Sequence, residues 1–129
     1  MKLSEYLGRT LPDWDWVHLD CCRWVDGWVQ ARGYASPMAA IGIQYDSERS
    51  AMRRIAEGGG LVRLWCDAMR QIGVGVADSP LPGNVGIVRR ATACGMDEAA
   101  GIWTGQRWVT LGLRGLDFGP AEPLAMWRV

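Results

Sequence analysis

Two adjacent cysteines, Cys21 and Cys22, stand at the start of a predicted helix and are the side chains of this chain best suited to chemistry. Asp20 is a good N-cap residue, and Gly33 supplies a stop. The free N–H groups and partial positive charge of a helix N-terminus favour thiolate over thiol, so Cys21 is a candidate nucleophile. A free cysteine also behaves as a small hydrophobic residue, and that structural role is the alternative. Apolar residues at the spacing of a buried helix face are Cys21, Trp24, Val25, Trp28 and Val29.

A cysteine hydrolase also needs a base, which takes the thiol proton and returns it to the leaving amine. His18 is the only histidine, and it lies in the segment just before the helix, so we interpret it as a loop or packing residue. The carboxylates of Asp97 and Glu98 are poorly matched to a thiol near neutral pH, and a negative charge nearby raises a thiol pKa. Asp20 opposes thiolate formation for the same reason. We therefore expect Cys21 to be a buried thiol of low reactivity.

The cysteine pattern does not indicate a metal or a cofactor. Four cysteines, at positions 21, 22, 66 and 94, have neither the paired spacing of a zinc site nor the density of a secreted disulfide scaffold. Because Cys21 and Cys22 are adjacent, we expect them to point to different faces of the helix, which argues against a shared zinc or iron–sulfur site. We expect free thiols.

Length and composition are those of one globular domain spanning residues 1–129. The chain is 49% hydrophobic and has eight tryptophans, enough to build a core. Fourteen basic and fourteen acidic residues give a net charge of zero, so we expect no binding to nucleic acid or to an anionic membrane surface. No run of eighteen apolar residues and no signal segment occurs, and we expect synthesis in the host cytoplasm.

Helical patterns precede strand patterns along the chain, and this order predicts an α+β fold. The change falls near residues 73–80. The predicted helices cover about 3–7, 21 to the stop at Gly33, 37–41, 47–57 and 61–72. The predicted strands cover 85–89, 100–104, 108–113 and 124–128, with a hairpin turn at 104–107.

Three motifs resemble those of NlpC-type cysteine peptidases, papain-like enzymes that cut peptidoglycan stem peptides. Residues 20–25 resemble the Asp-Cys-Ser-Gly/Arg-hydrophobic motif that opens the central helix of that family, with Cys21 in the nucleophile's place. Residues 81–88 resemble the Pro-Gly-Asp turn into its first strand, with Asn84 where Asp is usual. Residues 99–108 resemble its His-Val-Gly-Ile-Tyr hairpin, but Ala99 stands where the family has its general base. The resemblance implies helices packed on a C-terminal antiparallel sheet, with the base missing.

A closer resemblance, over nearly the whole chain, is to small proteins encoded in the tail modules of tailed phages, prophages and gene-transfer agents. It implies a structural protein of the tail tip or baseplate, located in the virion and contacting other tail-tip or baseplate hub proteins. The alternative is an active peptidase of the tail tip that cleaves peptidoglycan; a bacterial cytoplasmic adaptor is a third reading. The matching motifs, in order, are Leu11-Pro12-Asp13-Trp14, residues 20–25, Gly59-Gly60-Leu61-Val62, residues 82–88 and Leu124-Ala125-Met126-Trp127-Arg128-Val129.

Two aromatic segments that contain prolines are candidates for an interface. The loop at 11–17 carries Trp14 and Trp16, and the C-terminal segment at 118–129 carries Trp127 and Arg128. Tryptophan and arginine are enriched at binding hot spots, so we assign subunit contacts to Trp14, Trp16 and Arg128. Glycan stacking is the alternative for the first two, and packing inside the monomer is the alternative for Trp127.

Overall fold

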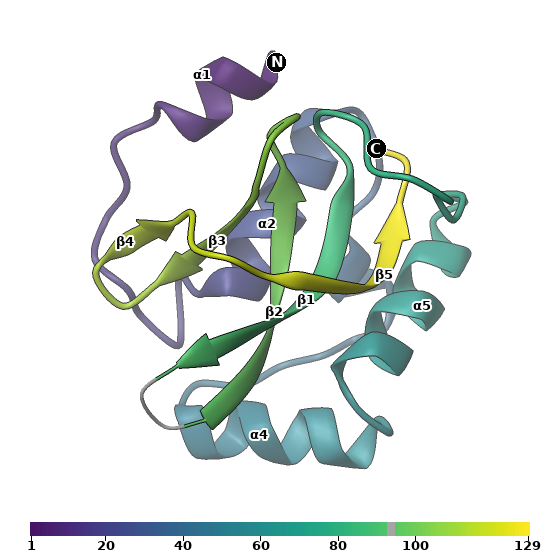
Figure 1. The fold of residues 1–129 in the computed structure, drawn as a ribbon. Helices are drawn as coiled ribbons and strands as arrows, with labels where there is room; N and C mark the ends of the chain where they lie inside the picture. Colours follow the sequence, from purple (N-terminus) through teal and green to yellow (C-terminus); the bar gives the residue numbers. More distant parts are fainter. Residues whose placement is uncertain (93–94) are drawn as a thin grey trace.

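The computed structural model describes residues 1–92 and 95–129, and in this part of the chain five helices precede five strands (Figure 1). The mixed helix and sheet composition confirms the predicted α+β class. None of the described helices is long and apolar enough to cross a membrane. The helices are α1 (Leu3–Leu7), α2 (Cys21–Ala31), α3 (Pro37–Ala40), α4 (Glu48–Glu57) and α5 (Leu61–Gln71). The strands are β1 (Val85–Thr92), β2 (Gly95–Trp103), β3 (Trp108–Gly112), β4 (Gly115–Asp117) and β5 (Glu122–Trp127).

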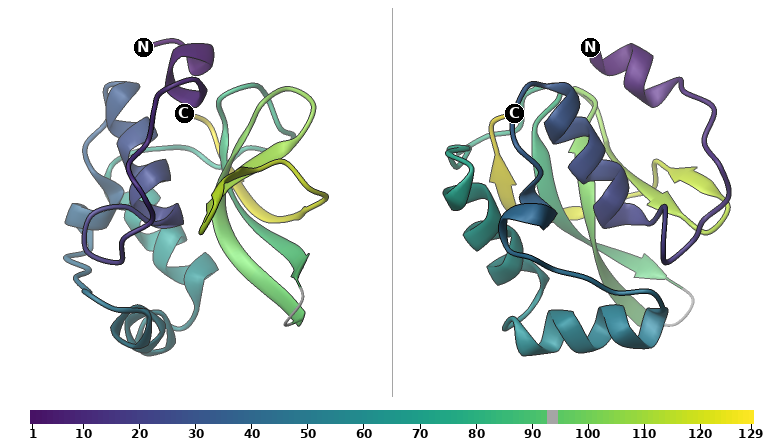
Figure 2. Two further views of the ribbon diagram at one scale, coloured as in Figure 1. Left: turned by 90° about the vertical axis from the view of Figure 1, so that its left-hand side faces the viewer. Right: turned by 180° about the vertical axis from the view of Figure 1, so that it is seen from behind.

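The strands form one antiparallel sheet in the order β4-β3-β2-β1-β5, and the helices lie against one side of it (Figure 2). The hairpin turn between β2 and β3 is as predicted: the N–H of Thr104 donates to the carbonyl of Arg107 at 2.9 Å. Strand β2 begins earlier than the expected residue 100. The charged residues Asp97 and Glu98 interrupt the apolar pattern, and so the strand was expected to start after them. In the structure Asp97 is paired with Arg90 of β1, and Glu98 is paired with Arg89. The three-residue strand β4 was not predicted, because it is too short to show a pattern.

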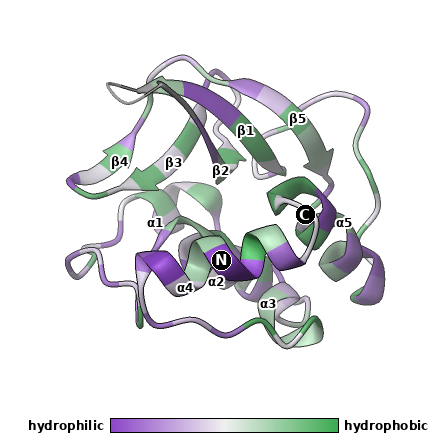
Figure 3. Cartoon of the chain, turned by 90° about the horizontal axis from the view of Figure 1, so that it is seen from below, coloured by the Kyte–Doolittle hydropathy of each residue, from purple (hydrophilic) through white to green (hydrophobic). Residues whose placement is uncertain are grey.

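The core lies between α2, α5 and the sheet, and its aromatic residues connect the two layers. Trp24 and Trp28 of α2 are each 1% exposed, which confirms the predicted buried face. Trp127 of β5 packs on Trp65 of α5 with ring centroids 6.5 Å apart, so it belongs to the monomer's own core. The hydroxyl of Tyr6 in α1 donates to the carbonyl of Trp24 and fastens α1 to α2. The helices carry both hydrophobic and hydrophilic residues, as elements with one buried face require (Figure 3).

Arg90 of β1 is a buried side chain that binds groups on β3, on β4 and on the segment after β4. Its guanidinium donates to Thr110 Oγ1 at 2.5 Å and to the carbonyls of Trp108, Asp117 and Gly119 at 2.9–3.2 Å. The Asp117 carboxylate lies 3.1 Å from Nη1 and supplies the opposite charge. One buried side chain therefore ties β1, β3, β4 and the segment after β4 together.

Substituting Arg90 by leucine removes the donor for four carbonyl groups, including that of Pro120, and removes the charge partner of Asp117. We expect Arg90→Leu to lower the free energy of unfolding by about 2–4 kcal/mol in urea titrations. Arg89→Leu is the matched control, because Arg89 is half-exposed and lies 3.9 Å from Glu98. A surface pair of that kind contributes about 0–1 kcal/mol. Equal effects of the two substitutions would contradict the anchoring role of Arg90.

Candidate functional site

The carboxylate of Asp20 begins α2 and is buried, with 1% of its residue surface exposed. Its Oδ1 accepts the N–H groups of Cys22 and Arg23 at 2.9 and 3.0 Å, which confirms Asp20 as the N-cap. The cap satisfies two of the free N–H groups of the first turn. It thereby fixes the backbone of both cysteines.

The second carboxylate oxygen of Asp20 joins the helix start to the loop before α4. Its Oδ2 accepts Arg23 Nη1 at 2.5 Å and the hydroxyl of Tyr45 at 2.7 Å. The Arg23 guanidinium also stacks 4.3 Å from the centre of the Tyr45 ring and donates to the carbonyls of Tyr45 and Trp16. Burial, with the negative charges of Cys22 and Asp20 adding to it, raises the pKa of Tyr45 far above its ordinary value. Tyr45 is therefore a permanent hydrogen-bond donor to Asp20.

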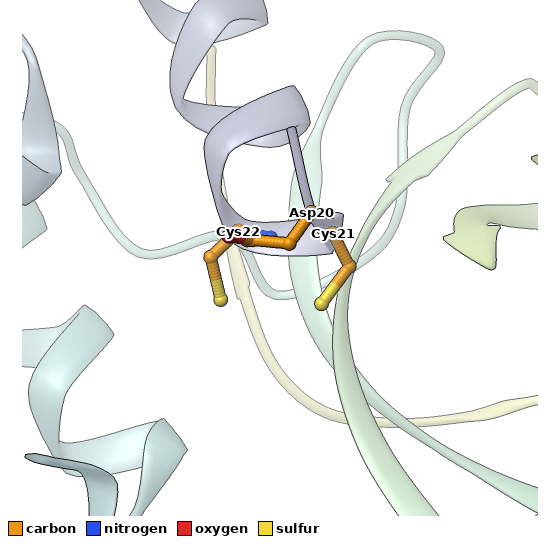
Figure 4. Close-up of side chains that lie close together, drawn as sticks. All are labelled: Asp20, Cys21 and Cys22. Carbon is orange, nitrogen blue, oxygen red and sulfur yellow. The ribbon is translucent and has the colours of Figure 1, made fainter. Parts of the chain in front are cut away.

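The two thiols lie together at this helix start, contrary to the expectation that they would point to different faces. The Sγ atoms of Cys21 and Cys22 and a carboxylate oxygen of Asp20 all lie within 4.8 Å of one another. Both sulfur atoms project from the first turn, away from the body of the helix (Figure 4). Both residues are partly buried and pack against the hydrophobic core, and the low reactivity expected of Cys21 stays a prediction.

Hydrogen bonding to its sulfur lowers the pKa of Cys21. The largest cause is the thiol of Cys22, which donates to that sulfur; the backbone N–H of Ala100 in β2 donates as well. Burial, the second-largest cause, and the charge of Asp20 act in the opposite direction, and the net result is a lowered pKa. Donating to Cys21 correspondingly raises the pKa of Cys22 well above its ordinary value, with burial adding to the rise. The pair therefore consists of a thiolate-prone Cys21 and a Cys22 that keeps its proton.

The same cluster is poorly suited to hold a metal ion. Asp20, Cys21 and Cys22 are the one group of three potential ligands found among the described residues. The two oxygens of Asp20 already accept four hydrogen bonds from the protein, which leaves the two sulfurs without a free third ligand. Cys66 lies in α5, partly buried against the core, and Cys94 lies outside the described residues.

A cavity of about 980 Å³ opens beside the thiols and is lined by Cys21, Cys22 and Asp20. One side is formed by α3, α4, α5 and the segment between α3 and α4, and it is mostly apolar. The other side is formed by β2, β3 and β4 and includes charged groups. Side chains on the helical side include Met38, Ile41, Ile43, Met52, Ile55 and Leu64. Residues on the sheet side include Arg90, Asp97, Glu98, Ala99, Thr110 and Asp117.

Ala99, the residue at the expected position of the base, lines this cavity together with Cys21. It directly precedes Ala100, and alternation along β2 turns the side chains of residues 99 and 100 to opposite faces of the strand. No histidine is found among the described residues that line the cavity. The side chain of His18 is 78% exposed and lies 3.0 Å from Asp15, as expected of a loop residue.

The predicted interface residues do not form one surface. Trp14 and Trp16 are partly buried, pack edge to face with centroids 5.0 Å apart, and line the cavity. Arg128 is exposed and follows β5, at the opposite edge of the sheet from β4. The loop carrying the tryptophans runs along the β4 side, and the C-terminus lies on the β5 side (Figures 1 and 2).

The thiol pair yields a test of which hydrogen bond activates Cys21. We expect the rate of Cys21 alkylation by iodoacetamide to rise with pH around a midpoint below that of free cysteine, because only the thiolate reacts. Cys22→Ala removes the main donor and should move this midpoint to higher pH. Cys22→Ser keeps a hydroxyl donor and should move it less. Peptide mass mapping, with Cys66 as internal reference, gives the midpoint of Cys21 alkylation in each variant. An unchanged midpoint in Cys22→Ala would contradict the assignment of Cys22 as the main donor.

Comparison with known proteins places the chain in a family. No curated protein and no solved structure matches it. A family model described as Domain of unknown function (DUF6950) matches residues 2–129. The match includes the thiol pair, the Asp20 cap and all five strands. The chain therefore belongs to the DUF6950 family.

Proposed function

We propose that this protein is a structural component of the tail tip or baseplate of a phage or phage-like particle, built on an NlpC-type, papain-like fold without a catalytic base. The observation that carries the loss of activity is Ala99, which shares the cavity with Cys21 where the peptidase motif has histidine. The order of tail-module motifs along the chain supports the place in the virion.

Two features of the architecture support the papain-like part of the proposal. The thiol stands at the first turn of a helix that packs on an antiparallel sheet, as in the peptidases that the motifs resemble. Strand β2, which is expected to carry the base, packs on α2, and its Ala99 lines the cavity together with Cys21. Ala99, in the place of the base, is the departure from the peptidase motifs that bears on catalysis.

The groups around Cys21 favour a nucleophile but not peptide cleavage. Breaking an amide bond requires a proton for the leaving amine, which a histidine would return. Cys22 is the thiol in contact with Cys21, and its raised pKa makes it a weak proton donor. Asp97 and Glu98 are exposed carboxylates on β2, and Glu98 lies 3.9 Å from Arg89. General acid–base catalysis contributes about 10²–10⁴-fold, and this site lacks the group that would supply it.

An active tail-tip peptidase is the second candidate. The observation in its favour is the lowered pKa of Cys21 at the wall of a large cavity, which is typical of activated cysteines. A base would then have to come from another subunit of the particle or from the substrate.

Purified protein should release no soluble muropeptides from peptidoglycan, because no group returns a proton to the leaving amine. Chromatography of digests of defined stem peptides is the measurement, and Cys21→Ser is the matched control. Release that disappears in Cys21→Ser would overturn the structural assignment. Ala99→His adds a gain-of-function arm: cleavage by this variant alone would identify residue 99 as the missing part of the site.

The tryptophan loop is the surface that we assign to neighbouring tail-tip proteins. Trp14 and Trp16 present partly exposed rings beside the cavity, close to the exposed Val17. Arg128 is assigned to a separate contact on the β5 side.

Trp16→Ala should leave a folded, soluble monomer and reduce incorporation into tails about ten-fold or more, as expected for a hot-spot residue. Arg32→Ala, an exposed position at the end of α2, is the control. Normal assembly of Trp16→Ala would remove the loop from the interface.

A further inference from the structure

We propose that Cys21 accepts an acyl group by exchange with a fatty acyl thioester, and that the apolar side of the cavity holds the acyl chain. The reacting atom lies where this requires it. Cys21 is partly exposed and lines the cavity, and the Sγ atom of Cys22 and a carboxylate oxygen of Asp20 lie within 4.8 Å of its sulfur. The inference does not depend on a place in a phage tail.

The exchange needs none of the groups that the site lacks. The Cys21 thiolate attacks the thioester carbonyl carbon, a new carbon–sulfur bond forms, and the original carbon–sulfur bond breaks. The leaving thiolate departs with the electron pair and takes its proton from water, so no general acid is required. A thiolate leaves readily when its pKa is near that of the attacking thiol, whereas an amine must be protonated before it leaves. The loss of the base at residue 99 therefore blocks peptide cleavage and leaves thiol exchange open.

The side of the cavity formed by α3, α4 and α5 suits a hydrocarbon chain better than a peptide. Its lining includes Met38, Ile41, Ile43, Ile55 and Leu64. Of the polar side chains on this side, the hydroxyl of Tyr45 already donates to Asp20, and Glu48 is exposed. A peptide would bring N–H and C=O groups that need partners there, whereas an acyl chain brings none. The cavity volume of about 980 Å³ is at the upper end of the range for small-molecule sites, which leaves room for a fatty chain.

The test compares two thioesters of N-acetylcysteamine, octanoyl and acetyl, on the full chain. Intact-mass spectrometry follows transfer, hydroxylamine release confirms a thioester, and peptide mapping locates it. We expect octanoyl transfer to Cys21 to be about ten-fold or more faster than acetyl transfer, because six additional methylene groups leave water. Cys21→Ser should abolish transfer, and Cys66→Ser, the matched control, should leave it unchanged. Equal rates for the two thioesters, or label on Cys66 as fast as on Cys21, would overturn the proposal.

A cavity-filling variant separates the chain site from the thiol. Ile55→Trp narrows the apolar side of the cavity at α4. The rate of acetyl transfer to this variant reports whether its thiol site is intact. We expect the octanoyl rate to fall to the acetyl rate in this variant. If Ile55→Trp does not fold, competition by free decanoic acid is measured on the unsubstituted protein instead. Slower octanoyl transfer at an unchanged rate of acetyl transfer supports binding of the acyl chain to the apolar side of the cavity. No competition, or an unchanged octanoyl rate in folded Ile55→Trp, overturns it.

Discussion

The buried carboxylate of Asp20 is the constraint on which the site depends. It accepts two backbone N–H groups of the first turn of α2, and it also accepts Arg23 and Tyr45. A buried carboxylate is tolerated only when donors surround it in this way. The same bonds set the helix start against the loop before α4, and so they determine where the two sulfur atoms lie relative to the sheet.

This arrangement separates two properties that cysteine peptidases combine. Thiolate formation at Cys21 is favoured by hydrogen bonds from Cys22 and from the backbone of β2, so it does not require an imidazole. Proton return to a leaving amine does require one, and residue 99 is alanine. A thiol that is activated but has no acid partner is suited to reactions whose leaving group departs as an anion. The proposed loss of peptidase activity and the proposed acyl exchange therefore have the same cause, an activated thiol without an acid partner.

The parts of the structure that sequence could predict are those with a local cause. Helix α2, its Asp20 cap and the hairpin turn between β2 and β3 follow from residues a few positions apart, and all three were predicted. Tyr45 and Arg90 were missed, because their roles depend on contacts with segments 20–30 residues away. The two thiols lie closer together than predicted: adjacency along a helix suggested divergence, whereas the two Sγ atoms lie within 4.8 Å of each other. No periodicity in the sequence carries that information.

The measurement that tests the central claim most directly is the free energy of unfolding of Tyr45→Phe. Tyr45 donates to the buried carboxylate of Asp20, and phenylalanine keeps the ring over Arg23 while removing that donor. The account predicts a loss of about 1–3 kcal/mol in urea titrations. Tyr34→Phe, at an exposed position, should change the free energy of unfolding by less than about 0.5 kcal/mol. If Tyr45→Phe is as stable as Tyr34→Phe, the Asp20 carboxylate does not organise the site in the way described.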